Sequence, residues 1–112
     1  MTINSTQPDL AGEVTPPAGA QGDAWQLNNG KSYRTIYGTA RGVADRPDIS
    51  LSPAAVQFAD GTVDNGDQIE PPVLYVEFDS ERGLTAVQAR ALATALVNAA
   101  AQLDRWQWSV PG

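Results

Sequence analysis

The chain lacks two residue types altogether, because its 112 residues include no cysteine and no histidine. Without cysteine there is no disulfide, no thiolate metal site and no thiol nucleophile. Without histidine the chain also lacks the commonest metal ligand and the usual general base of enzymes. It contains no glycine-rich phosphate loop and no G-x-S-x-G motif. We therefore expect a protein that is not an enzyme and that binds no metal and no cofactor.

Basic residues and long apolar runs are also scarce. Seven lysines and arginines stand against thirteen aspartates and glutamates, which gives a formal net charge of −6. Such a chain has few cations to displace the counterions of nucleic acids or anionic membranes, so we expect direct contact with neither. Polar residues interrupt the longest apolar segment, which is therefore unsuited to spanning a membrane. Since no signal-peptide pattern is present, the expected location is the cytoplasm.

The first 23 residues contain several prolines and glycines and show no apolar periodicity. A segment of this kind buries too little apolar surface to offset its conformational entropy. We therefore predict a disordered N-terminal arm over residues 1–23. Residues 24–112 are then expected to form a single domain, because that length suits one hydrophobic core.

Three segments with alternating residue patterns predict β-strands. The first covers residues 32–42, after an Asn-Asn-Gly turn, and its Gly38 marks a bulge or a close backbone approach. The second covers residues 49–58 and keeps a period of two on both sides of Pro53, which favours a bulged strand over a short helix capped by Ser52. In the third, VLYVEF, Leu74, Val76 and Phe78 point to one face, and Val73, Tyr75 and Glu77 point to the other.

Residues 84–106 carry the most regular pattern in the chain. Thr85 and Gln88 have the spacing of a capping box, and no glycine or proline follows up to Arg105. Apolar residues recur at spacings of three and four, so we predict a helix that packs across the sheet through this stripe. The alternative is an amphipathic helix that faces a partner. The stripe consists of Ala89, Leu92, Leu96, Ala99, Leu103 and Trp106.

These elements define the predicted fold class, which is α+β. We expect an antiparallel sheet of three to four strands, with one long C-terminal helix packed on one face and the disordered arm preceding both.

Acidic residues gather in the loop before the third strand. The spacing does not match an EF-hand, because placing Gly66 at the invariant glycine puts Gly61, Val63 and Pro72 at ligand positions. We expect a solvated loop that protects a sheet edge. A weak cation site is one alternative, and an acidic face for a basic partner, or one that mimics nucleic acid, is another. The candidate interaction residues in this loop are Asp64, Asp67 and Glu70.

Three tyrosines are predicted to share the sheet face that the helix leaves open, near Arg34 or Arg41. Such a row can serve cross-strand packing, contact with another protein or stacking of nucleic-acid bases, and the net charge argues against the last. A tryptophan beyond the helical stripe either anchors the chain end in the core or is exposed for binding. The candidate interaction residues are therefore Tyr33, Tyr37, Tyr75 and Trp108.

The segment PPVLYVEFDSERGLTAVQARALATALVNAAAQLDRW resembles the strand–loop–helix ending of small actinobacterial and actinobacteriophage proteins. In those proteins an LT..QAR.LA.AL..AA helix follows a strand that ends in Val-Glu. The resemblance covers about a third of the chain. Because that family has no established activity, it implies a bacterial or phage setting inside the cell and assigns no role to any residue.

Composition and pattern together favour a small non-enzymatic accessory protein that acts by binding another protein, and a second copy of the chain is one candidate partner. Two alternatives stay open. One is a nucleic-acid-associated regulator, which a negative field over the whole surface would disfavour, or an acidic protein that mimics DNA. The other is a small ligand-binding or hydrolase domain, which needs an enclosed pocket.

Overall fold

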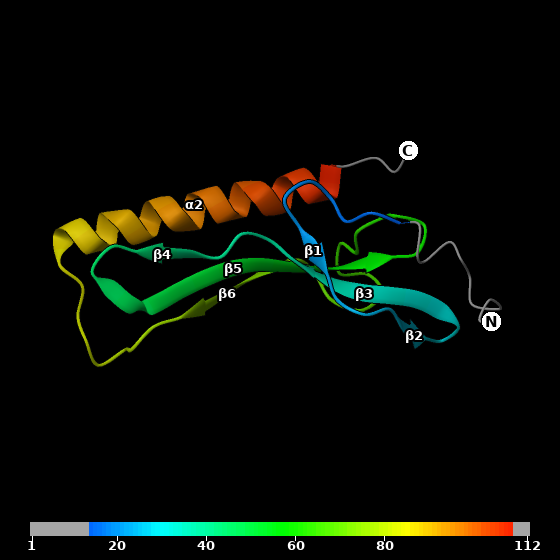
Figure 1. Cartoon of the computed structure of the whole chain (residues 1–112), viewed down its shortest axis with the longest axis horizontal. Helices are drawn as coiled ribbons and strands as arrows, with labels where there is room; N and C mark the ends of the chain where they lie inside the picture. Colours follow the sequence, from blue (N-terminus) through cyan, green and yellow to red (C-terminus); the bar gives the residue numbers. More distant parts are fainter. Residues whose placement is uncertain (1–13, 109–112) are drawn as a thin grey trace, which may run out of the picture.

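The computed structural model describes residues 14–108, which form one antiparallel sheet with one long C-terminal helix on a single face (Figure 1). This confirms the predicted α+β class. The sheet has six strands rather than three to four, because some strands are only two or three residues long and leave no periodic pattern. The elements are β1 (Gln21–Gly22), β2 (Gln26–Asn28), β3 (Lys31–Tyr37), β4 (Arg41–Val43), β5 (Arg46–Phe58), β6 (Val73–Glu77) and α2 (Ala86–Trp108).

The sheet is organised around β5, which is 13 residues long. β3 pairs with the C-terminal half of one β5 edge, and β4 pairs with the N-terminal half of the same edge. β6 pairs with the opposite edge of β5, while β1 and β2 extend the sheet beyond β3. Figure 1 shows α2 running lengthwise over the part of the sheet formed by β4, β5 and β6. β6 therefore lies on the side of the sheet away from β1 and β2.

Pro53 lies inside β5 and accounts for the break between β3 and β4. The Gly38 N–H donates to the Pro53 carbonyl oxygen at 2.9 Å, so the Pro53 nitrogen faces the same edge, where it offers no N–H. The ladder cannot continue there, and β3 ends at Tyr37. A Cβ atom on Gly38 would lie 2.5 Å from Pro53 Cγ, which confirms the expected close approach. The strand interpretation of residues 49–58 is confirmed. The bulge expected at Pro53 is not present, because the pairing with β6 runs through Pro53 without a shift; a register shift lies instead between Gly42 and Val43 of β4.

The helix α2 begins with the predicted capping box. The Gln88 N–H donates to Thr85 Oγ1 at 3.1 Å, and the Thr85 N–H donates to Gln88 Oε1 at 3.0 Å. Near its other end, Trp106 packs in a buried cluster with Ile36 and Ala55. The predicted leucines of the stripe pack against the core, which confirms that α2 covers the sheet. A second cluster contains Leu51, Ala95 and Ala99, with Leu74, Leu92 and Leu96 packed against it.

Residues 14–20, which we call the N-terminal strap, lie against the domain beside the end of α2 (Figure 1). Three buried side chains hold this segment through its main-chain carbonyl oxygens. Because these bonds are accepted by main-chain atoms, they do not depend on which side chains the strap has. The donors and acceptors are Arg34 Nη2 to Val14 O at 2.9 Å, Gln57 Nε2 to Thr15 O at 3.1 Å, and Gln102 Nε2 to Gly19 O at 3.3 Å.

The ordered domain therefore begins earlier than residue 24. Ala20 packs against the Trp106 cluster, β1 pairs with β3, and the Asp23 N–H donates to the Thr35 carbonyl oxygen at 2.8 Å. Residues 14–23, which the sequence assigns to a disordered arm, are in contact with the sheet or with α2, because buried side chains far along the chain supply donors for them. The rest of the predicted arm, residues 1–13, lies outside the described residues.

Candidate functional site

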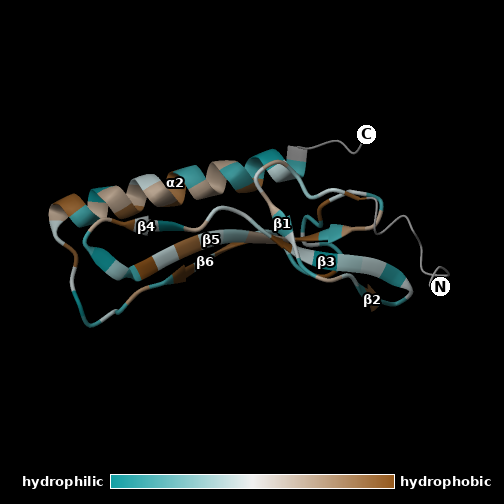
Figure 2. Cartoon of the chain, viewed as in Figure 1, coloured by the Kyte–Doolittle hydropathy of each residue, from teal (hydrophilic) through white to brown (hydrophobic). Residues whose placement is uncertain are grey.

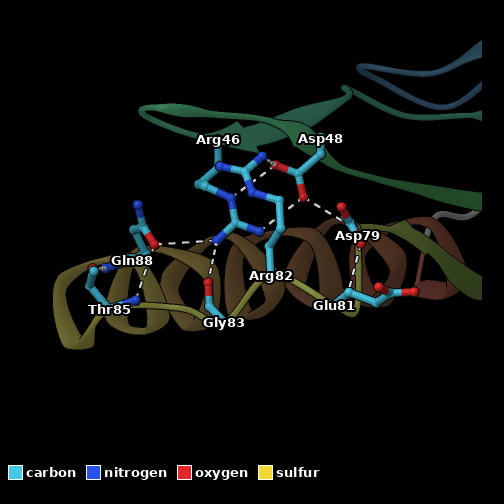
Figure 3. A network of polar contacts seen from close by, with 8 residues as sticks. All are labelled: Arg46, Asp48, Asp79, Glu81, Arg82, Gly83, Thr85 and Gln88. Carbon is cyan, nitrogen blue, oxygen red and sulfur yellow. Dashed lines mark hydrogen bonds and ion pairs between the residues drawn. The ribbon is translucent and has the colours of Figure 1, made fainter.

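An ion pair between the buried Arg46 and the partly buried Asp48 fixes the loop between β6 and α2. The Arg46 side chain is 2% exposed and binds Asp48 in a bidentate manner, with Nε–Oδ1 and Nη2–Oδ2 distances of 2.9 Å. Its Nη1 also donates to the Gly83 carbonyl oxygen at 2.7 Å and to Gln88 Oε1 at 3.3 Å. Figure 3 shows these groups converging from β5, the loop and the start of α2. Arg46 thus links the start of β5 to the loop before α2 and to the first turn of α2.

The Asp48 carboxylate extends the same network on its other side. It accepts the Asp79 N–H at 3.0 Å and Arg82 Nη1 at 3.3 Å (Figure 3). The loop after β6 is therefore drawn toward the first residues of β5. Because Arg46 is buried and both Asp48 oxygens accept hydrogen bonds from within the domain, we assign this ion pair a structural role.

This network predicts a dependence of stability on pH. Hydrogen bonds from Arg46, and then from the Asp79 N–H, hold the pKa of the Asp48 carboxyl well below its ordinary value. A carboxyl with a lowered folded-state pKa stabilises the fold above its unfolded pKa of about 3.9, and this contribution is lost as the pH falls toward the folded pKa. We expect Asp48→Asn to lower the urea midpoint at neutral pH, with the difference narrowing between about pH 4 and pH 2. Urea unfolding of both proteins at several pH values measures this difference in midpoint. A difference that does not change with pH would contradict the stabilising role of the Asp48 carboxylate.

The acidic loop is organised by Asp64, which is 2% exposed. Burial alone would raise the pKa of the Asp64 carboxyl, but hydrogen bonds from four backbone N–H groups outweigh it and the pKa is lowered. Asp64 therefore stabilises the loop from within and presents no carboxylate to a partner, so the structure disagrees with its prediction as an interaction residue. The donors are the N–H groups of Gly66 (2.9 Å), Gln68 (3.3 Å), Ile69 (2.6 Å) and Glu70 (3.0 Å).

The remaining acids of this region are on the surface. Asp67 and Glu70, the other two loop candidates, are both exposed. Residues 65–81 contain five acidic residues and no lysine or arginine. The surface on both sides of β6 in the sequence is therefore strongly negative. The five acids are Asp67, Glu70, Glu77, Asp79 and Glu81, and all of their residues are exposed.

The three predicted tyrosines lie on the face away from α2. Leu51 and Ala55 of β5 contact the helix, so the residues of β5 that alternate with them face the other way. The tyrosines are paired opposite such residues, and directly paired side chains project to the same face. Tyr37 is 39% exposed and Tyr75 is 54% exposed. The pairs are Tyr33 with Phe58, Tyr37 with Ala54, and Tyr75 with Ser52.

The tyrosines do not form one cluster with the arginines. Tyr37 and Tyr75 lie on opposite sides of β5, whereas the half-buried Tyr33 lies farther along β3 and donates to Gln26 Oε1 at 3.1 Å. Arg34 and Arg41, predicted as their neighbours, lie on the α2 face, because their strand partners are Gln57 and Leu51. Stacking of bases between these tyrosines and arginines is therefore not supported.

Trp108, the last predicted interaction residue, is the final residue of α2. Its side chain lies outside the described residues.

β6 forms an edge of the sheet. Among the described strands only β5 pairs with it. The Pro53 backbone faces β3, so its pair with Leu74 is of the non-hydrogen-bonded type. By the same alternation, the N–H and C=O groups of Leu74 and Val76 point away from β5. These outward groups have the spacing that a further strand requires.

The side chains at this edge are largely apolar and exposed. Figure 2 shows hydrophobic colour along β6 and hydrophilic colour in the loop that follows. Tyr75 is 54%, Val76 40% and Phe78 48% exposed. Phe78, predicted to point the same way as Leu74, follows the last residue of β6 and is exposed, so it does not enter the core. We call the outward backbone of Leu74 and Val76, together with the Tyr75, Val76 and Phe78 side chains, the β6 edge.

A small open cavity of about 330 Å³ lies beside the turn between β2 and β3. Its one cation, Lys31, is engaged, because Nζ donates to Gln68 Oε1 at 2.7 Å and lies 4.2 Å from the centre of the Phe58 ring. Its lining residues are Asn28, Asn29, Lys31, Phe58, Gln68 and Ile69.

Within residues 14–108, no three acidic side chains come together as a metal site would require. No helix in that same span has the length and apolar content to cross a bilayer.

Comparisons of the chain with protein-family models, with curated proteins and with solved structures gave no match.

Sequence reasoning missed two features that matter for the site. The β6 edge was not identified, because the sequence does not show which strand is last in the sheet. The strap was not identified either, although the run Val14-Thr15-Pro16-Pro17 favours an extended conformation and was the one available signal.

Proposed function

We propose that this protein is a small non-enzymatic accessory protein that binds another protein through the β6 edge. The observation that carries the proposal is the outward backbone of Leu74 and Val76, which no other strand within residues 14–108 pairs, beside the exposed side chains of Tyr75, Val76 and Phe78. An exposed sheet edge with apolar side chains is a template for a strand from another chain. The cytoplasmic location expected from the sequence belongs to the same proposal.

Pull-down from cell lysate with edge variants tests this function. Val76→Pro removes an outward N–H without removing a hydrogen bond to β5, so the variant should fold and lose its partner. Phe78→Ser changes a 48% exposed side chain and leaves the backbone intact, so it should weaken capture at least about fivefold. The matched control is Val97→Asp on the outer face of α2, where Val97 is 68% exposed.

Circular dichroism and urea unfolding first establish that each variant is folded. We expect a captured protein that is present with the parent chain and with Val97→Asp and is depleted with both edge variants. Equal capture by all four chains, or loss only with Val97→Asp, would place the binding surface elsewhere.

A further inference from the structure

The β6 edge presents two chemically different sides to an added strand. On the α2 side the added strand meets Val76, which is 40% exposed and is paired opposite Leu51, beside the partly buried Leu74 and Leu96. Residues of the added strand that point to this side must be apolar, because they cover hydrophobic surface that is now in contact with water.

On the opposite side the added strand meets Tyr75 and Glu77. Tyr75 is 54% exposed, and Glu77 is an exposed carboxylate two residues further along the same face. An aromatic ring and a carboxylate at this spacing favour a lysine or arginine, which can contact the ring face and pair with the acid. The two sides alternate along a strand, so the complementary sequence alternates between apolar and basic residues.

The wider charge distribution distinguishes a basic segment from a second copy of the chain. Residues 65–82 hold five acids and one base, Arg82, whose Nη1 donates to Asp48 Oδ1 at 3.3 Å. Two of the arginines, Arg34 and Arg46, are buried in internal contacts, so they offset little of this negative surface. If two copies paired through β6 in antiparallel register, the acids that precede one strand would meet those that follow the other. Like charges at that distance repel, whereas a basic segment is attracted.

From these observations we propose that the β6 edge binds an extended segment of a partner protein in which apolar residues alternate with lysine or arginine. The segment adds a seventh strand beside the six of the sheet, with its apolar residues toward α2 and its basic residues toward Tyr75 and Glu77. The inference rests on the proposed function and specifies the chemistry of the partner.

Binding of a synthetic peptide to the full chain tests the inference. The probe is a fluorescently labelled peptide of about ten alternating lysine and valine residues, and its control carries glutamate in place of lysine. Fluorescence anisotropy should show saturable binding of the lysine peptide and at least about tenfold weaker binding of the glutamate peptide. Raising the salt from about 0.05 M to about 0.5 M should weaken the lysine peptide at least about fivefold.

Three variants locate the interaction. Val76→Pro should abolish binding of the lysine peptide, and Glu77→Lys should weaken it about tenfold. Asp23→Lys is the charge-matched control, because Asp23 is bonded to the far side of β3, away from β6, and it should change the affinity less than about twofold. Amide hydrogen exchange should slow at Leu74 and Val76 when the peptide is bound.

The outcomes separate this inference from the proposed function. If the lysine peptide does not bind while Val76→Pro still loses its cellular partner, the partner chemistry is wrong and the β6 edge remains a binding surface. Equal affinity for both peptides would also overturn the charge argument. A dimer in sedimentation equilibrium that Val76→Pro dissociates would identify the second copy as the occupant and reject the basic partner.

Discussion

Removal of the N-terminal strap should destabilise the domain by about 3 to 5 kcal/mol. A chain that begins at Gln21 lacks the carbonyl oxygens that accept hydrogen bonds from Arg34, Gln57 and Gln102. It also loses the contact of Ala20 with the Trp106 cluster. Since small domains are stable by about 5 to 15 kcal/mol, the loss is a large fraction of the total. With a urea m-value of about 1.5 kcal/mol/M, the midpoint should fall by about 2 M or more.

The reference for this comparison is a chain that begins at Val14, which retains every described strap contact. A second control is Thr15→Ala, because the strap is held through main-chain oxygens and the Thr15 residue is exposed. It should change the free energy of unfolding by less than about 0.5 kcal/mol. If the chain that begins at Gln21 unfolds at the same urea concentration as the reference, the strap is not part of the stable domain.

The long elements could be predicted because their signals are local. α2 has a capping box, an uninterrupted run of good helix formers and an apolar stripe, all within one segment. β5 and β6 show a period of two over enough residues to be recognised. In each case the local preference agrees with the packing, so no tertiary contact had to override it.

The short strands and the strap could not be predicted, because they exist through contacts with distant residues. β1 is two residues long and is a strand only because it pairs with Tyr37 and Ile36 of β3. The strap depends on donors from β3, β5 and α2, the last of which is 83 residues away in the chain. Its proline and glycine content indicates an irregular backbone, and that is compatible both with disorder and with an extended segment held by side chains.

In the candidate site, too, some features could be predicted from the local sequence and others depend on long-range contacts. The sequence identified the acidic loop and the tyrosine-bearing face, since residue type and strand alternation suffice for both. It could not show that Asp64 points inward, because the four N–H groups that bind its carboxylate come together only when the loop folds. Nor could it show that β6 is an edge strand, because strand order depends on long-range pairing. The β6 edge is therefore a feature of the tertiary structure.

Truncation of Trp106 should have the largest effect of any single substitution on the α2 face. Trp106 is 2% exposed and packs against Ile36 and Ala55, so Trp106→Ala leaves a cavity and should cost about 3 to 5 kcal/mol. Its Nε1–H is buried without a hydrogen-bond partner among the described residues. Trp106→Phe therefore loses ring volume but no hydrogen bond, and it should cost about 1 to 2 kcal/mol. Urea unfolding followed by circular dichroism measures both variants.

The matched control is Val97→Ala on the outer face of α2, where the side chain is 68% exposed and the cost should be under about 0.5 kcal/mol. Equal costs for Trp106→Ala and Trp106→Phe would show that ring volume is not what the site requires. If Trp106→Ala folds with unchanged stability and loses only its partner, α2 is a partner-facing helix. We expect Trp106→Ala to cost most, Trp106→Phe less and Val97→Ala least. This order follows because the inner face of α2 packs against the sheet and the strap, whereas its outer face is exposed to solvent.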